Sequence, residues 1–84
     1  MNVQIRYFAS LREALGPGES VAGLPEGSTL ASLRDALIAR GGAHATALAR
    51  GRSVRCALDQ KMSDEGAVLR DGAEVAFFPP VTGG

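Results

Sequence analysis

One predicted helix, long and amphipathic, limits the folds open to this chain more than any other feature. Leu30, Leu33 and Leu37 recur at helical spacing and give this helix one apolar side. Gly41 and Gly42 then end the pattern. Because a single helix covers only one face of a β-sheet, the strands around it are expected to form a two-layer α+β domain. The opposite face of that sheet is left for solvent or a partner.

Strand patterns lie on both sides of this helix. Residues 2–8 and 54–58 alternate apolar and polar side chains, which is typical of half-buried strands. The dipeptide Asp71-Gly72 separates residues 67–69 from residues 74–78. Both turn residues accept positive φ, so this spacing predicts a hairpin between the two segments.

Shorter elements complete the predicted order. Ser10 and Glu13 have the spacing of a capping box, which predicts a short helix that begins at Ser10. Ser28 or Thr29 is expected to cap the long helix. The remaining predictions are a weak strand at 20–24, a helical turn at 43–49, a turn at 59–60 and a short strand at 61–62.

Length, charge and cysteine usage limit the class of protein. A chain of 84 residues is expected to form one domain, spanning 1–84. Nine basic and nine acidic residues cancel, which argues against nucleic acid as the main partner. No apolar run approaches the roughly 20 residues that span a bilayer. The lone cysteine and the strand pattern directly after Met1 favour a cytoplasmic protein without a secretory signal or a membrane partner.

The last six residues, 79–84, are expected to protrude as a tail. Pro79 and Pro80 lack amide hydrogens and fix φ, so they end the last strand and keep the chain extended. Gly83 and Gly84 have no side chains, which leaves the terminal carboxylate slim and open to attack. No side chain in the tail is charged. The sequence therefore predicts that the carboxylate of Gly84 is offered to a partner, for binding or for chemistry.

The residue at the root of this tail is a candidate contact. If Val75 and Phe77 face the core, strand alternation turns Phe78 outward as a possible binding hot spot. The alternative, that Phe78 packs under a loop or against Pro79, stays open. With Gly84 as the reacting residue, the candidate partner-binding residues are Phe78, Pro79, Pro80, Val81, Thr82 and Gly83.

Other reactive residue types give no signal of a site. Cys56 falls at an inward strand position and is expected to be a buried thiol. His44 has no cysteine, histidine or carboxylate at ligand spacing, so it is expected at the surface and no metal site is predicted. No glycine-rich phosphate loop joins a strand to a helix, so no nucleotide cofactor is expected on this chain.

The final segment, FFPPVTGG (77–84), closely resembles the C-terminus of the small subunits of molybdopterin synthase, which belong to the ubiquitin-like sulfur carriers. Residues 3–9 are similar to the first strand of that family, and residues 71–76 to the approach to its last strand. Asp59 stands where the family commonly carries asparagine. The resemblance implies a β-grasp, ubiquitin-like fold: a mixed sheet of four or five strands packed on one main helix, with an extended C-terminal tail.

The resemblance also implies a cycle of sulfur transfer. An activating enzyme uses ATP to adenylate the Gly84 carboxylate, and a sulfur donor enzyme then replaces AMP to leave a thiocarboxylate. The large subunit of the synthase receives the tail, and the sulfur is donated to a pterin precursor. The chain would be a carrier that is not itself an enzyme, in a heterotetramer of two small and two large subunits.

Two alternatives remain open. The chain could carry sulfur for another pathway, such as thiamine, cysteine or tRNA thiolation. It could also be a protein modifier that is joined through Gly84 to lysines of target proteins.

Overall fold

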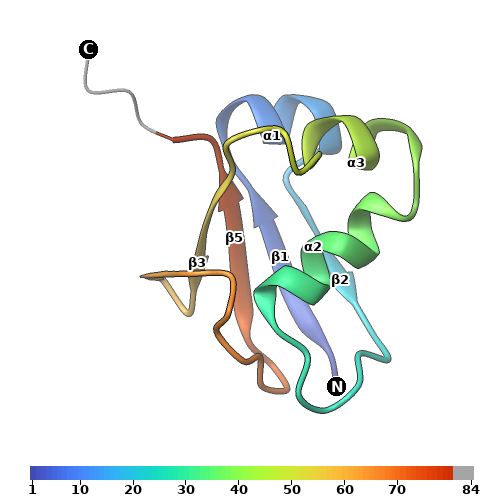
Figure 1. Cartoon of the computed structure of the whole chain (residues 1–84). Coiled ribbons are helices and arrows are strands. Elements are labelled where there is room, and N and C mark those ends of the chain that lie inside the picture. Colours follow the sequence, from blue (N-terminus) through green and yellow to red (C-terminus); the bar gives the residue numbers. More distant parts are fainter. Residues whose placement is uncertain (81–84) are drawn as a thin grey trace.

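The computed structural model describes residues 1–80, which form a five-stranded sheet and three helices (Figure 1). In chain order the elements are β1 (Val3–Tyr7), α1 (Ala9–Leu15), β2 (Gly18–Val21), α2 (Leu30–Ile38), α3 (Gly42–Ala47), β3 (Arg55–Leu58), β4 (Lys61–Ser63) and β5 (Glu74–Phe78). Among these residues no helix is long and apolar enough to cross a membrane.

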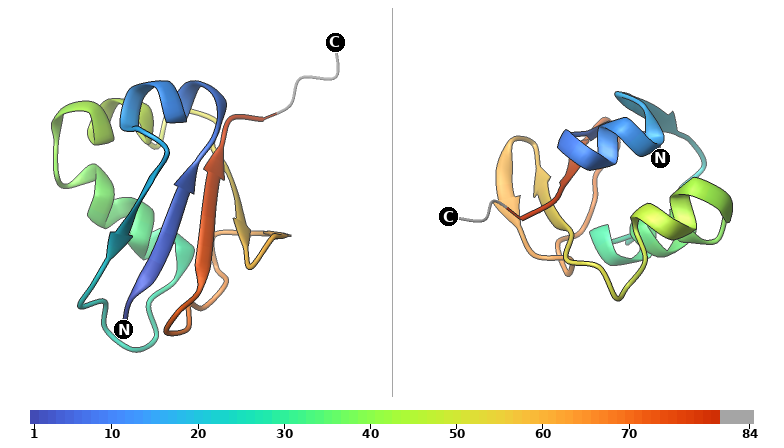
Figure 2. Two further views of the ribbon diagram at one scale, coloured as in Figure 1. Left: turned by 180° about the vertical axis from the view of Figure 1, so that it is seen from behind. Right: turned by 90° about the horizontal axis from the view of Figure 1, so that it is seen from above.

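The sheet has the strand order β2-β1-β5-β3-β4. The first and last strands, β1 and β5, lie side by side and parallel, and every other pair is antiparallel. Figure 2 shows this sheet from behind, with β5 in its middle. A mixed sheet built from the two ends of the described chain around one main helix confirms the expected α+β, β-grasp fold.

The inner face of the sheet packs against α2. Leu30, Leu33 and Leu37 are each at most 1% exposed, as the helical spacing predicts. They form one core with the inward residues of β1 and β5, namely Val3, Ile5, Tyr7, Val75 and Phe77. Burial of this set drives the assembly, because each large apolar side chain removed from water contributes about 1.5–3 kcal/mol.

Thr29, rather than Ser28, caps α2. The Thr29 hydroxyl accepts a hydrogen bond from the Ser32 amide at 3.1 Å, and the Ser32 hydroxyl accepts one from the Thr29 amide at 2.8 Å. This reciprocal pair satisfies two amides that the first helical turn would otherwise leave without partners. Ser28 instead donates its hydroxyl to the carbonyl of Pro25.

The predicted capping box at Ser10 is wrong. Helix α1 begins at Ala9, with Phe8 as its N-cap and no side-chain hydrogen bond at the cap. The Phe8 carbonyl accepts from the amides of Leu11 and Arg12, so the helix follows β1 almost directly. This early start turns Leu11 into the core, where it is 4% exposed.

The predicted hairpin before β5 is also wrong. Residues 67–69 do not pair with β5, because both sides of β5 are already occupied by β1 and β3. Val68 instead forms an isolated antiparallel bridge with Thr29, at the start of α2. The turn itself is present, with Gly72 at a φ of 81°.

The edge strand β2 begins earlier than predicted, at Gly18 rather than Ser20. Gly18 lies opposite Arg6 of β1, where the two backbones come close. A Cβ at Gly18 would stand 2.3 Å from the carbonyl oxygen of Ile5. Only glycine fits such an approach, so this residue sets where the strand can begin.

The other short elements agree with the sequence. Helix α3 overlaps the predicted helical turn at 43–49 and begins one residue earlier, at Gly42. Asp59 and Gln60 adopt φ angles of 50° and 68° and join β3 to β4 in a tight hairpin. Such left-handed pairs match the twist of antiparallel strands.

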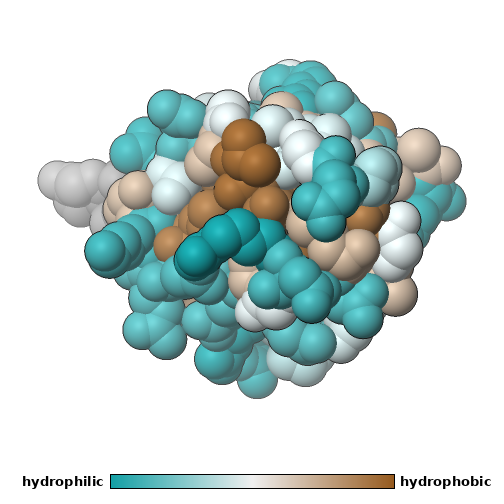
Figure 3. Space-filling model, turned by 90° about the horizontal axis from the view of Figure 1, so that it is seen from below, coloured by the Kyte–Doolittle hydropathy of each residue, from teal (hydrophilic) through white to brown (hydrophobic). Residues whose placement is uncertain are grey.

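Helices α1 and α3 lie together over the end of the sheet at which β1 and β5 finish (Figures 1 and 2). Pro79 and Pro80 leave the sheet at this same end. Figure 3 shows the opposite end, where apolar side chains gather within a ring of hydrophilic ones. The large exposed apolar residue of the loop before β5 is Val68, at 57%.

Candidate functional site

The root of the tail is held firmly in the sheet. Phe77, two residues before Pro79, is fully buried and lies between Tyr7 of β1 and Cys56 of β3. The rings of Tyr7 and Phe77 stack with centroids 6.4 Å apart and planes 20° apart. Because β5 is hydrogen-bonded on both sides, the position of the chain where it reaches Pro79 is fixed by the sheet.

Phe78 faces away from the core, as strand alternation predicts. It lies opposite Arg55 on the outer face of the sheet and is half-buried. Pro79 is half-buried and Pro80 is exposed. Of the predicted tail, four residues lie outside the described part of the chain: Val81, Thr82, Gly83 and Gly84.

An apolar surface surrounds this root on the outer face of the sheet. Phe8 directly follows β1 and donates its amide to the carbonyl of Phe77, which places it beside Phe78. Met62 of β4 lies opposite Ala57, which in turn lies opposite Ala76 of β5. We call the outward-facing set the outer patch: Phe8, Met62, Ala76 and Phe78.

Two members of the outer patch were missed by sequence reasoning. Phe8 is 42% exposed and Met62 is 60% exposed, both high for large apolar side chains. Phe8 did carry a signal, because it continues the outward series of Gln4 and Arg6 along the first strand. No sequence pattern marked Met62, because the direction of its side chain is set by the pairing of β4 with β3.

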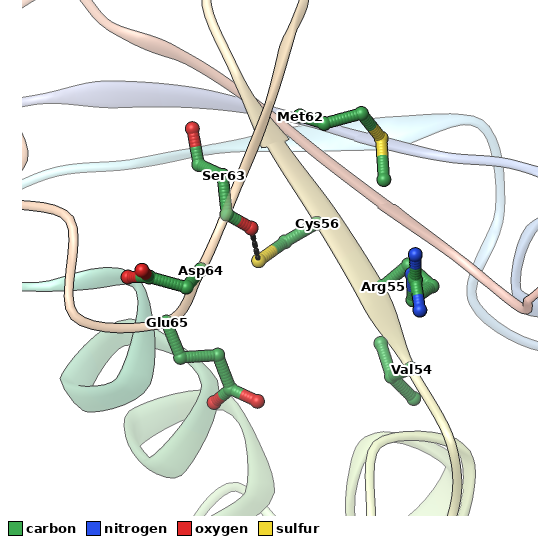
Figure 4. A pocket seen from close by; sticks show the side chains of 7 residues that line it. All are labelled: Val54, Arg55, Cys56, Met62, Ser63, Asp64 and Glu65. Atoms are coloured by element: carbon green, nitrogen blue, oxygen red, sulfur yellow. Dashed lines mark hydrogen bonds between the residues drawn. The ribbon is translucent and has the colours of Figure 1, made fainter.

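A pocket of about 510 Å³ lies at β3, β4 and the residues after β4, and side chains from both faces of the sheet line it. Figure 4 shows Cys56 in this cavity, with its sulfur directed at the carbonyl of Ser63, to which the thiol donates at 3.3 Å. Burial, with the nearby Glu65 carboxylate, raises the pKa of the Cys56 thiol. The prediction that Cys56 is buried is confirmed, and a raised pKa disfavours the thiolate that nucleophilic chemistry needs.

The environment of His44 differs from the surface position that the sequence predicts. His44 is half-buried, and its Nε2 lies 2.9 Å from the Glu19 carboxylate. The Tyr7 hydroxyl donates to the same oxygen at 2.8 Å, and Arg40 pairs with the other oxygen. Sequence spacing could not reveal this contact, because His44 and Glu19 are 25 residues apart. Within residues 1–80 no group of three metal-ligating side chains occurs.

The described residues therefore combine a rigid tail root with an apolar surface beside it. The single thiol is buried, and the one histidine is engaged with a carboxylate. This arrangement suits a domain that docks against a partner and directs its C-terminal segment toward that partner.

Comparison with known proteins supports this interpretation. Residues 5–84 match the ThiS family. The chain is 38% identical over 84 residues to a molybdopterin synthase sulfur carrier subunit from Escherichia coli (strain K12), covering 98% of this chain and 99% of that protein. It is 32% identical over 82 residues to the protein of the same name from Haemophilus influenzae, with the same coverage.

Solved structures give the same fold. SAMP1 from Haloferax volcanii has a TM-score of 0.76 and 25% identity, with full coverage of both chains. A complex of subunits 1 and 2 of molybdopterin-converting factor from Helicobacter pylori contains a chain with a TM-score of 0.69 and 25% identity, again with full coverage of both. The chain therefore belongs to the ThiS family and is similar along its whole length to molybdopterin synthase sulfur carrier subunits.

Proposed function

We propose that this protein carries sulfur on its C-terminal Gly84 and donates it to a pterin precursor within molybdopterin synthase. The observation that carries the proposal is the full-length similarity to molybdopterin synthase sulfur carrier subunits, together with a ThiS family match that includes Gly83 and Gly84. The rigid root of the tail supports it, because a group carrier must direct its end into another protein's site.

The chemistry follows from the nature of a carboxylate. A free carboxylate is a poor acyl electrophile, since its charge repels nucleophiles and oxide is a poor leaving group. An activating enzyme that uses ATP would attach AMP to the Gly84 carboxylate and release pyrophosphate. A sulfur donor enzyme would then displace AMP and leave a thiocarboxylate. ATP would bind to the activating enzyme, and this chain would hold no cofactor of its own.

Docking would raise the local concentration of the sulfur at its acceptor. The outer patch is the surface that we assign to the large subunit, because Phe8 and Phe78 flank the point where the tail leaves the sheet. The solved complex of the two Helicobacter pylori subunits supports a large subunit as the partner. Tethering makes sulfur transfer effectively intramolecular. The assembly would be a cytoplasmic heterotetramer of two small and two large subunits, in which this chain is a non-catalytic carrier.

A protein modifier is the second candidate function, and the likeness to a small archaeal modifier protein 1 from Haloferax volcanii favours it. Such a modifier would form an isopeptide bond between Gly84 and a lysine of a target. The chain has a single lysine, Lys61, which is exposed on β4, so chains of this protein would be joined through that residue alone.

The proposal is tested by reconstituting the synthase with a truncated carrier. The full chain and a chain that lacks Gly84 are each given ATP, an activating enzyme, a sulfur source, the large subunit and the pterin precursor. We expect molybdopterin only from the full chain, and equal unfolding midpoints for the two proteins. Equal product from the truncated chain would contradict the carrier role. Conjugates to other proteins without any molybdopterin would favour the modifier.

A further inference from the structure

A hollow of about 230 Å³ opens on the outer face of the sheet, beside the root of the tail. Ala76, at the centre of β5, contributes only a methyl group, whereas its neighbours along the strand on the same face, Glu74 and Phe78, are larger. Arg6 of β1 lies on one side of Ala76 in the sheet, and Ala57 of β3 lies on the other. The residues that line the hollow are Arg6, Phe8, Gln60, Glu74 and Ala76.

The charged groups around this hollow already have partners. Arg6 lies 3.5 Å from the Glu74 carboxylate, and its guanidinium carbon is 5.8 Å from the centroid of the Phe8 ring. Glu74 also accepts a hydrogen bond from the Gln60 side chain at 3.4 Å. A charged guest would have to compete with these contacts, whereas an apolar guest can leave them in place and bury the ring of Phe8 and the methyl group of Ala76.

The size of the hollow excludes a cofactor-sized guest. Sites for small molecules generally occupy about 300–1,000 Å³, and this hollow is smaller. Its volume suits one large side chain. Interfaces between proteins commonly concentrate their binding energy where one aromatic or aliphatic side chain fills such a recess.

We propose that this hollow receives one large apolar side chain of the molybdopterin synthase large subunit, seated over Ala76. The inference rests on the proposed function, because it takes the large subunit as the partner. Continuity supports that occupant: Phe8 belongs both to the hollow and to the outer patch beside the tail root. A partner that receives the tail would cover this face, and the recess would fix the register in which it docks.

The test fills the hollow from this side. Ala76→Leu places a large apolar side chain in the recess while adding to the apolar surface of the sheet. Ser20→Leu is the matched control, because Ser20 is exposed on the same face but on the edge strand β2, away from the hollow. Affinity for the purified large subunit is measured by calorimetry with the full chain, and unfolding midpoints are measured in parallel.

We expect Ala76→Leu to raise Kd for the large subunit at least tenfold with an unchanged or higher unfolding midpoint, and Ser20→Leu to change Kd less than twofold. Should Ala76→Leu fail to fold, Ala76→Val makes the same test with a smaller side chain that favours strands. Wild-type affinity in the folded variant, or equal losses in variant and control, would overturn the inference. The inference would also be overturned if Ala76→Leu were no longer activated by the adenylating enzyme but bound the large subunit with unchanged affinity.

Mass spectrometry of the same samples separates this inference from the proposed function. If Ala76→Leu binds normally while the wild-type chain still gains sulfur at its C-terminus, only the role of the hollow is wrong. If the wild-type chain gains no sulfur with its activating enzyme, the proposed function itself fails.

Discussion

The Tyr7 hydroxyl donates a hydrogen bond of 2.8 Å to the Glu19 carboxylate, which ties the central part of the sheet to its edge strand β2. The same carboxylate is held by His44 and Arg40, so one acidic side chain joins β2 to α3 and to the residues after α2. Burial, together with the hydrogen bond to Glu19, raises the pKa of Tyr7 above its ordinary value.

Glu19 should make the stability of the protein depend on acid pH. Burial acts to raise its pKa, but hydrogen bonds from Arg40, His44 and Tyr7 outweigh that effect and lower the pKa from 4.5 to about 2. The unfolded chain therefore binds a proton first as the pH falls. The stabilisation is fully present above about pH 4.5 and is lost as the pH falls toward 2.

The measurement compares wild type with Glu19→Gln by chemical denaturation between pH 7 and pH 2.5. We expect the variant to be less stable at pH 7 by on the order of 1 kcal/mol, after allowance for solvent screening. The difference should shrink as the pH falls below about 4.5. Two stability curves that stay parallel down to low pH would contradict this role for Glu19.

Gly18→Ala should destabilise the protein, because the new Cβ would stand 2.3 Å from the Ile5 carbonyl oxygen. Relief of that clash requires β2 to move away from β1, at a cost of about 1–3 kcal/mol. Gly51→Ala is the control, since a Cβ at Gly51 meets nothing within 4 Å. Equal unfolding midpoints for the two variants would show that the close approach is not needed.

Arg34→Lys should cost more stability than an ordinary surface exchange. Arg34 is 3% exposed, and its guanidinium pairs with the Glu65 carboxylate at 3.0 Å. Its remaining donors bind three backbone carbonyls of the segment before β3, those of Leu48, Ala49 and Arg52. Lysine cannot reproduce this planar fork, so we expect a loss of about 2–3 kcal/mol in unfolding free energy.

The control for Arg34 is Arg70→Lys, because the Arg70 side chain is 81% exposed and makes one ion pair. This exchange should change stability by less than about 0.5 kcal/mol. If thermal or chemical unfolding shows the same small effect for both variants, the four contacts of Arg34 do not hold the loop as we argue.

Phe8→Ser should weaken binding of the large subunit by about tenfold or more, because a large apolar side chain is lost from the outer patch. Val68→Ser is the matched control: Phe8 is 42% exposed and Val68 is 57% exposed, but Val68 bridges to the start of α2, away from the patch. Calorimetry should show near-normal affinity for the control. Equal affinities of both variants would remove the outer patch from the interface.

The sequence predicts those elements whose burial follows a local period. Leu30, Leu33 and Leu37 mark α2 because every third or fourth residue must face the sheet, and residues 2–8 mark β1 because alternate side chains must do so. The turn at Asp59 was also visible, since its residue types tolerate positive φ. In each case the structure is determined by residues that are close together in the sequence.

Features that depend on contacts between residues far apart in the sequence could not be predicted from local patterns. One partner of β5 is β1, about 70 residues away in the sequence, and the other is β3. The turn residues at Asp71 and Gly72 favoured pairing with residues 67–69, but both sides of β5 are already occupied. Glu19 and His44 meet only because the fold brings β2 beside α3. Phe8 became a candidate only when Phe78 was placed beside it. Tertiary packing decided each of these outcomes.

Sulfur transfer to Gly84 is tested most directly by intact mass spectrometry of the protein after incubation with ATP, an activating enzyme and a sulfur source. A sulfur carrier should gain the mass that corresponds to replacement of one oxygen by sulfur, and fragmentation should locate this change at Gly84. The change should be absent when ATP is omitted. An unchanged mass with an activating enzyme that is active on its own carrier, or a sulfur atom located at Cys56 instead, would contradict sulfur transfer to Gly84.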